Sequence, residues 1–341
     1  MRKYITVLIC LLLITSGLSA CKDYEGLTDM PEIKLFYCRP EEGMINNPCI
    51  YDVKSGKSEI LAVEGCEDVY LYSTCGYSDG EFFACYETDD ECKILKVKDG
   101  KTVATHDFKA EFEAPESWEF SNHSILSIAR YKDGVLVLSP SVDSYCDEPF
   151  YADIPSTLYY VDFNGLCEPI IENVVTYKVY EDKICYSSFD EIRLVEYGDT
   201  SIYSKFNINI YENGETWELV QSEKCPYSSI EDWCNEKELL LMKDGNIVKY
   251  NIETQEEILM LKPKFYYSFE EGKTLYVSDR YILACAMKQN IFTLNSDVSY
   301  LYLFDTESNR RIMVSENLTG TYDAPFEIIN RQGMLSSAFL K

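Results

Sequence analysis

The side chains of this chain that could do chemistry are mainly carboxylates. There are 58 Asp and Glu residues but only two histidines, His106 and His123. Paired carboxylates, one acting as acid and the other as base or nucleophile, are the catalytic groups of glycoside hydrolysis. So few histidines make most histidine-based triads and multi-histidine metal sites hard to assemble. Because no motif singles out one pair among so many carboxylates, we assign no catalytic residue and keep a carboxylate-dependent carbohydrate-active enzyme as the alternative function.

Several sequence motifs with an established chemistry are missing. The chain contains no HExxH, GxxxxGK or GxGxxG, which disfavours zinc peptidases, P-loop proteins and dinucleotide-binding enzymes. Glu87, Asp89, Asp90 and Glu91 form an acidic run. This run lacks the alternate-ligand spacing and the glycine of an EF-hand loop, so a solvated loop is its default interpretation. We predict neither a metal site nor a cofactor.

The charge balance argues against one class of partner. The chain has 31 basic and 58 acidic residues, so its formal net charge is 31 − 58 = −27. A field of this sign repels phosphate backbones. We therefore expect no binding to nucleic acid.

Aromatic side chains are abundant, and many of them fall in irregular segments between strand-like runs. Flat aromatic faces with carboxylates nearby suit the ring faces and hydroxyl groups of a sugar, or a peptide. The candidate ligand-binding residues are Trp118, Tyr145, Phe150, Tyr151, Tyr227, Trp233, Tyr266, Tyr267 and Tyr322. The competing interpretation is that each of these rings packs between structural units and serves only the core.

Two cysteine pairs are candidates for disulfides. Cys38 with Cys49, and Cys85 with Cys92, each bracket a polar loop between two strand-like runs, and an exported chain permits such bonds. No CxxC pair occurs anywhere in the sequence. This absence argues against a zinc ribbon and against a thioredoxin-like redox site.

The first 21 residues have the order of a bacterial export signal. Arg2 and Lys3 precede an apolar run over residues 4–14, and residues 18–21 read Leu-Ser-Ala-Cys. The run is about half of the roughly 20 residues that a membrane-spanning helix needs, so it predicts a processed signal. The Leu-Ser-Ala-Cys ending resembles the bacterial lipoprotein family, which implies cleavage before Cys21 and lipidation of Cys21. The alternative is an ordinary small-residue cleavage site followed by an accidental cysteine.

These features predict three segments: a lipoprotein signal peptide at 1–20, a tether at 21–32 and a single folded domain at 33–341. The resemblance implies an extracytoplasmic protein anchored to the bacterial membrane by the lipid on Cys21. For the folded domain, the 28 Tyr, 16 Phe and 3 Trp residues favour strands over helices. An all-β body is therefore expected.

One strand-turn-strand pattern recurs through this domain. The copies span residues 49–61, 92–104, 158–171, 208–219, 247–259 and 301–314. Turn residues such as Ser-Gly, Asp-Gly and Asn-Gly at the tips supply the positive φ angles that two-residue hairpins need. The tips are 40 to 65 residues apart along the chain, which is the length of one propeller blade with insertions.

A second set of hairpins lies between these copies. They span residues 69–86, 125–138, 177–186 and 274–286, with the shorter run 239–242 in the same place of its unit. Two hairpins per period make a four-stranded blade. Pairing of residues 33–37 near one end with 326–340 at the other would complete a sixth blade and remove the open sheet edges. The sequence therefore predicts an all-β propeller of six four-stranded blades, closed by its N- and C-terminal strands.

The repeats resemble the six-bladed TolB-like propellers of exported bacterial proteins, over nearly all of residues 33–341. Trp-Asp pairs of WD40 blades and the kelch double glycine are absent. A large β-sandwich, or two, is the alternative fold. In a propeller, the loops between the second and third strands and between blades open on one face, and we expect function there. The predicted function is a membrane-tethered, non-catalytic module that binds a protein, a peptide or a glycan.

Overall fold

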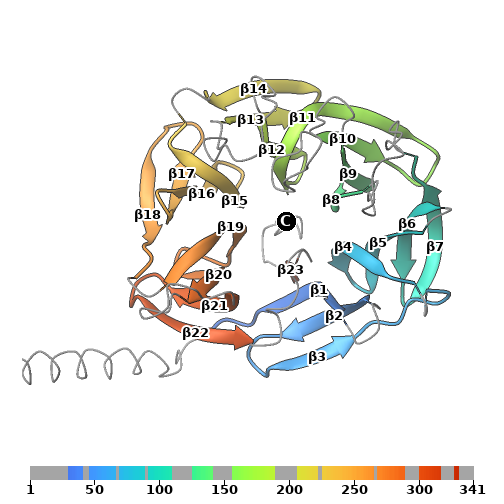
Figure 1. Ribbon diagram of the computed structural model, residues 1–341, viewed down its shortest axis with the longest axis horizontal. Helices are drawn as coiled ribbons and strands as arrows, with labels where there is room; N and C mark the ends of the chain where they lie inside the picture. The colour runs from blue at the N-terminus through green and yellow to red at the C-terminus, as the bar shows by residue number, and fades with distance from the viewer. Residues whose placement is uncertain are drawn as a thin grey trace, which may run out of the picture.

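The computed structural model of the chain forms 23 strands and no helix within the residues it describes. These residues are 30–40, 46–66, 69–88, 91–109, 125–140, 156–188, 206–221, 225–264, 267–288, 299–315 and 326–329. The strands form five antiparallel sheets arranged in a ring about a central axis (Figure 1). This ring is a β-propeller, and it excludes the alternative of a β-sandwich.

Four of the sheets have four strands each, and the strand order of each runs from the axis outwards. One is β23 (Phe326–Ile329), β1 (Lys34–Pro40), β2 (Asn46–Asp52) and β3 (Lys57–Ile60). The next along the chain is β4 (Leu71–Ser78), β5 (Glu81–Glu87), β6 (Cys92–Lys98) and β7 (Lys101–Asp107). The other two are β15 (Tyr227–Asn235), β16 (Glu238–Lys243), β17 (Asn246–Asn251) and β18 (Glu257–Leu261), and β19 (Tyr267–Tyr276), β20 (Tyr281–Lys288), β21 (Ser299–Asp305) and β22 (Arg310–Ser315).

The fifth sheet has seven strands because one long strand belongs to two blades. Its members are β8 (Ser127–Tyr131), β9 (Gly134–Pro140), β10 (Ser156–Val161), β11 (Cys167–Tyr180), β12 (Lys183–Ser188), β13 (Asn207–Glu212) and β14 (Glu215–Val220). The first half of β11 pairs with β10 and its second half pairs with β12, on either side of Val174. β11 is thus the outer strand of one blade and the inner strand of the next, and the described strands make six four-stranded units.

The ring is closed by strands from opposite ends of the described chain. β1 pairs with β23 in antiparallel register, from Lys34 opposite Ile329 to Tyr37 opposite Phe326. β1 also pairs with β2, and β2 with β3. The predicted closure of the 49–61 blade is therefore confirmed for residues 326–329, while residues 330–340 lie outside the described part.

The predicted hairpins are confirmed, and their tips show why. Both residues have positive φ at the tips Asp79-Gly80, Asp99-Gly100, Asn213-Gly214 and Asp244-Gly245, as a type I′ turn requires. Two predicted tips, near Thr254 and Ser308, have no glycine. There Gln255 and Asn309 adopt positive φ, and the side chains of Asn251 and Asp305 accept backbone N–H groups inside the turns.

Burial follows the position of a strand in its blade. The middle strands, such as β16, are buried on both faces because each sheet packs between two neighbours, whereas the outer strand β3 is exposed throughout. Leu240 of β16, Tyr267 of β19 and Phe304 of β21 belong to one hydrophobic cluster that spans two blades. Aromatic residues supply much of this interblade packing, which explains their abundance.

Candidate functional site

The predicted ligand-binding aromatics fall into two groups. Trp118, Tyr145, Phe150, Tyr151, Tyr266 and Tyr322 lie outside the described residues. The structure contradicts the expected loop position of the other three. Tyr227 and Trp233 are part of β15 and Tyr267 is part of β19, and their exposed fractions are 7%, 0% and 3%. None of these three rings offers a face to a ligand.

Specific contacts explain why these rings are buried. The indole N–H of Trp233 donates to the carbonyl of Lys178 on β11 at 3.1 Å, and its ring centroid lies 5.9 Å from that of Tyr180. The Tyr227 hydroxyl donates to the Glu257 carboxylate at 2.6 Å. Tyr227, Trp233 and Tyr267 therefore serve the packing of the core. The polar sequence around them suggests linkers, but β15 already begins at Tyr227 and β19 at Tyr267.

The predicted disulfide between Cys38 and Cys49 is not present. The register of β1 and β2 places Cys49 opposite Tyr37 and Cys38 opposite Pro48, so the two side chains lie on opposite faces of the sheet. The Cys38 thiol instead donates to the Thr74 hydroxyl at 3.5 Å. Burial raises the pKa of Cys38 to about 12, so this thiol stays protonated.

Cys85 and Cys92 do not form the second predicted disulfide either. Both are thiols in this structure. Cys85 lies opposite Ile94, and Cys92 lies opposite Glu87. The two cysteines share a face of the sheet but are one diagonal step apart, because the polar loop between them adds residues to the hairpin.

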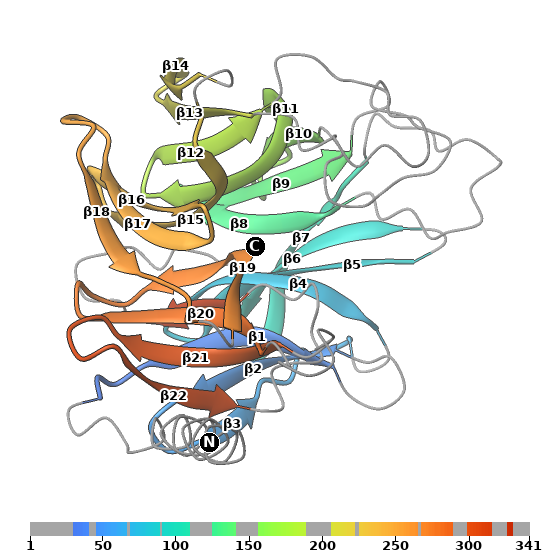
Figure 2. The same ribbon diagram turned by 60° about the vertical axis from the view of Figure 1, so that its left-hand side comes forward.

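Charged side chains are buried on the strands nearest the axis. Lys178 of β11, Glu231 and Asp232 of β15 and Glu327 of β23 are at most 1% exposed. In both views β15 and β19 lie side by side on the axial side of their blades (Figures 1 and 2). Because buried charges need partners to be tolerated, the contacts of these residues define the candidate site.

A bulge in β19 forms the centre of this site. Residues 270–273 of β19 stand opposite Cys285 alone, and Gly272 in the bulge has φ 71°. The Gly272 N–H donates to Glu231 Oε1 at 2.8 Å, and the Gly272 carbonyl accepts from Lys178 Nζ at 3.2 Å. The backbone N–H and carbonyl of Gly272 are thus held by side chains from the two preceding blades; we call Glu231, Gly272 and Lys178 the β19 clamp.

Glu231 is itself the extra residue of a bulge in β15, between Ile230 opposite Leu241 and Asp232 opposite Leu240. Its Oε1 also accepts from the Ser229 hydroxyl. Its Oε2 is buried and has no hydrogen-bond donor within the described part of the chain. The bulge therefore directs a carboxylate into the interior and leaves one of its oxygens available.

The protonation equilibria of the clamp are shifted by burial. Desolvation raises the pKa of Glu231, against the lowering effects of Ser229, Lys178 and the Gly272 N–H. Desolvation likewise lowers the pKa of Lys178 to about 8, although Glu231 and Asp232 oppose this. Burial thus shifts both groups towards their neutral forms, and shifted pKa values of this kind are common at functional sites.

A second clamp of the same design joins the closing blade to its neighbour. Gly76 and Tyr77 of β4 stand opposite Phe82 alone, and Gly76 has φ 73°. The Gly76 N–H donates to Glu327 Oε1 at 2.6 Å, and its carbonyl accepts from Arg130 of β8 at 3.1 Å. We call Glu327, Gly76 and Arg130 the β4 clamp. In both clamps a glutamate, a bulged glycine and a cation come from three consecutive blades.

Other acidic groups are also engaged with the backbone. Asp232 accepts the N–H of Trp233 at 2.8 Å on one oxygen and that of Tyr276 at 2.7 Å on the other. The second oxygen of Glu327 accepts the Tyr77 N–H at 3.3 Å. These carboxylates hold strands of adjacent blades together, so they act as structural acceptors.

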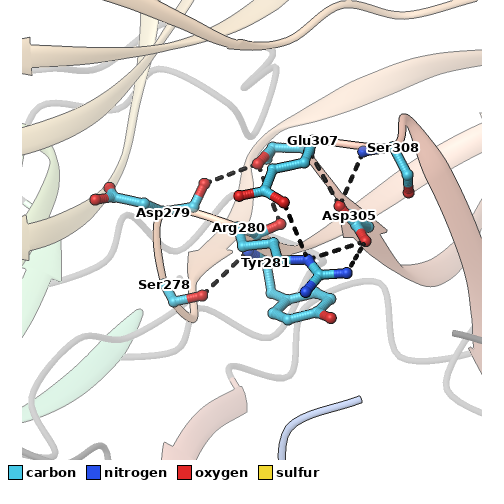
Figure 3. A network of polar contacts seen from close by, with 8 residues as sticks. Ser278, Asp279, Arg280, Tyr281, Asp305, Glu307 and Ser308 are labelled. Carbon is cyan, nitrogen blue, oxygen red and sulfur yellow. Dashed lines mark hydrogen bonds and ion pairs between the residues drawn. The ribbon is translucent and has the colours of Figure 1, made fainter. Parts of the chain in front are cut away.

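In a polar network at the hairpin tips of the last blade, a carboxylate again accepts backbone N–H groups (Figure 3). One oxygen of Asp305 accepts from the Arg280 guanidinium at 3.0 and 3.2 Å, and the other accepts the N–H groups of Glu307 and Ser308. Burial opposes ionisation, but Arg280 and the Ser308 N–H hold the pKa of Asp305 below its usual range. The guanidinium also lies over the Tyr281 ring. The network fixes two turns and leaves no carboxylate oxygen of Asp305 for a ligand.

The sequence reasoning missed both clamps. The available signal was a charged residue inside an otherwise apolar strand: Lys178 lies in Tyr-Lys-Val-Tyr, and Glu231 lies in Ile-Glu-Asp-Trp. A Gly-Lys pair interrupting β19 at residues 272–273 is a further signal of a bulge. Nothing in the sequence shows that these segments meet.

Two further findings concern the described residues. No helix among them is both long and apolar enough to span a bilayer. No group of three or more His, Cys, Asp or Glu side chains among them is placed to hold a metal ion.

The ring of sheets and the clamps between its blades define the chain as a β-propeller. Several solved structures are similar to it at low sequence identity. Hydrazine synthase of Kuenenia stuttgartiensis matches with TM-score 0.52 and 11% identity, covering 86% of this chain and 46% of that one. TolB from Acinetobacter baumannii matches with TM-score 0.48 and 9% identity over 86% of this chain and 65% of that one. YCF48 bound to D1 peptide matches with TM-score 0.47 and 9% identity over 92% and 97%.

At these identities the likeness concerns the fold alone. No protein-family model and no curated protein sequence matches the chain. The function therefore has to be argued from the residues of this chain.

Proposed function

We propose that this chain is an exported, lipid-anchored propeller that acts as a non-catalytic binding module for a protein, a peptide or a glycan. One observation carries the non-catalytic part: the buried carboxylates of the axial strands serve as acceptors for backbone N–H groups. Asp232 and Glu327 do so with both oxygens, and Glu231 with one. Carboxylates committed to joining blades give a rigid ring, and loops carried by a rigid scaffold are where binding residues concentrate.

The anchoring part of the proposal is supported by the N-terminal sequence. A basic start, a short apolar run and Leu-Ser-Ala-Cys ending at Cys21 stand in the order that a bacterial lipoprotein has. Several acyl chains on one cysteine would give durable attachment to a membrane. The propeller would then act outside the cytoplasm, at the surface of that membrane.

The binding face is tested most directly at Trp118 and Tyr151. An array of glycans and short peptides is probed with the wild-type protein and with Trp118→Ala and Tyr151→Ala. We expect binding to at least one ligand class, weakened by these two variants. Trp217→Ala is the matched control, because Trp217 is a tryptophan 40% exposed on the outer strand β14. Equal loss in all three variants, or no bound ligand at all, contradicts the proposal.

One observation favours the alternative, a carbohydrate-active enzyme. Glu231 combines a raised pKa with a buried oxygen that has no donor within the described residues, and a general acid in glycoside hydrolysis needs a raised pKa. Hydrolysis of a panel of oligosaccharides by the wild type, abolished in Glu231→Gln, would establish the enzyme. An absence of turnover with every substrate would support the binding module.

A further inference from the structure

A groove of about 220 Å³ lies between the closing blade and the blade that follows it. It is lined by Lys34, Ile50, Glu59 and Ile329 from the closing blade, and by Tyr77 and Asp79 from the next. Lys34 pairs with Ile329, and Ile50 pairs with Glu59, across their strands, so all four lie on the same face of the sheet. The groove is thus a gap between two facing blades, beside the turn that joins β4 to β5.

The apolar part of the groove is rigid. The Tyr77 ring packs against Phe36 with centroids 5.3 Å apart and stacks on Phe82 at 6.3 Å. The Tyr77 N–H is held by Glu327 of the β4 clamp. The clamp therefore fixes one wall of the groove, and the ring keeps its position without a ligand.

The charged groups of the groove are not engaged in hydrogen bonds or close ion pairs among the described residues, although Lys34, after the Ser55 N–H, contributes to lowering the pKa of Asp52, which faces Lys34 across the strands. The side chains of Lys34, Glu59 and Asp79 are exposed and form no hydrogen bond or ion pair there. Lys34 faces Asp52 across the strands, but the Asp52 carboxylate accepts the N–H of Ser55 at 2.7 Å.

The fold also keeps these charges from pairing with one another. Lys34 on β1 and Glu59 on β3 are separated by β2 and are offset by two residues along the strands, so their backbones are about 12 Å apart. Asp79 belongs to the opposite wall. On that wall Lys98 donates to the backbone carbonyl of Asp79 at 2.8 Å and leaves the carboxylate of Asp79 to the groove.

We infer that this groove binds a short peptide of two or three residues with free ends. An extended peptide advances about 3.5 Å per residue, so the terminal ammonium and carboxylate of a tripeptide can reach opposite charges on residues about 12 Å apart. The carboxylate meets Lys34, the ammonium meets Glu59 and Asp79, and an apolar side chain lies on Tyr77 and Ile50. A volume of about 220 Å³ is below that of a typical drug-sized pocket, which limits the occupant to this size. The groove lies on the face of the tight turns, opposite the face of the loops between second and third strands, so the inference goes beyond the proposed function and names a second site.

Calorimetric titration with the tripeptide Ala-Leu-Ala tests the inference. The N-acetylated tripeptide lacks the ammonium, the C-terminal amide lacks the carboxylate, and glucose replaces the peptide by a sugar. We expect the free tripeptide to bind, and each blocked form to bind about tenfold more weakly, as the loss of a charge-assisted hydrogen bond predicts. No binding of the free tripeptide, equal binding of the blocked forms, or binding of glucose instead overturns the inference.

Variants assign each end of the ligand to the charged residues that bind it. Lys34→Met should remove the difference between the free tripeptide and its amide and keep the difference for the acetylated form. Glu59→Gln and Asp79→Asn should do the reverse, and Asn tolerates the positive φ of Asp79. Glu218→Gln on the exposed strand β14 is the control and should change nothing. If the tripeptide fails to bind while Trp118→Ala and Tyr151→Ala still lose an array ligand, this inference fails and the proposed function stands.

Discussion

Glu327 and Gly76 are 251 positions apart in the chain, yet Glu327 Oε1 accepts the Gly76 N–H at 2.6 Å. The strand that carries Glu327 closes the ring through its ladder with β1. Through this hydrogen bond β23 is also joined to β4 of the next blade. Closure of the ring is therefore a property of three elements together: β23, β1 and β4.

Removing the closing strand should destabilise the whole ring. Deletion of residues 327–341 removes the ladder partner of β1 and the glutamate of the β4 clamp, so the open edges of two blades are exposed. We expect the cooperative melting transition of the entire propeller to move to lower temperature. Glu327→Gln keeps the strand and should lose roughly 1–3 kcal/mol, as measured by denaturant unfolding. A deletion variant with an unaltered transition would contradict the closure.

Gly76→Ala should be more destabilising than an ordinary glycine substitution. Gly76 has φ 73°, and an added Cβ would lie 2.9 Å from the Cβ and Cδ of Arg130. Backbone strain alone costs roughly 1–2 kcal/mol, and the clash adds to it. Gly214→Ala is the matched control, because Gly214 has φ 86° but open space around it. Equal losses of unfolding free energy in the two variants would show that the contact with Arg130 does not matter.

The β19 clamp should give the stability of the protein a distinct dependence on pH. The pKa of Lys178 falls to about 8 on folding, so between about pH 8 and 10.5 the unfolded chain binds more protons and stability rises with pH. The pKa of Glu231 is raised on folding, and this has the opposite effect. As the pH rises above the ordinary pKa of a glutamate, the folded chain binds more protons than the unfolded chain, so stability falls.

Comparison with Lys178→Met removes this contribution, since groups that do not interact with Lys178 titrate equally in both proteins, and Glu231, which does interact with it, is a carboxyl group. We expect the unfolding free energy of the wild type to increase relative to the variant by up to roughly 3 kcal/mol from pH 8 to 10.5. Chemical denaturation across this range measures it. A constant difference between the two proteins would mean that Lys178 keeps an ordinary pKa when folded.

The proposed lipid anchor at Cys21 makes the simplest prediction. Replacing Cys21 by Ala removes the only sulfur at the end of the export signal, so no acyl chain can be attached there. We expect the variant to leave the membrane fraction and to appear in soluble extracytoplasmic material. Immunoblotting of fractionated cells measures this, with Cys10→Ala inside the signal as control. Unchanged membrane association of Cys21→Ala would refute the anchor.

The local structure of this propeller could be predicted because it depends on neighbours in the chain. Alternation of apolar residues determines which face of a strand is buried, and Asp-Gly or Asn-Gly tips determine where the chain reverses, as at Asp79-Gly80 and Asn213-Gly214. The repeat of these hairpins at blade-length spacing was sufficient to predict the ring and its closure. The proposed export signal also rests on contiguous residues alone, and it stays a prediction.

Tertiary structure alone decided which side chains meet. Lys178 and Glu231 meet at Gly272 only because of the bulges in β15 and β19, and a bulge shifts register in a way that composition does not encode. Strand register placed Cys38 and Cys49 on opposite faces, although their spacing in the chain suits a disulfide. Trp233 is polar-flanked in the sequence and fully buried in the ring, because burial depends on the neighbouring blade and not on the segment itself.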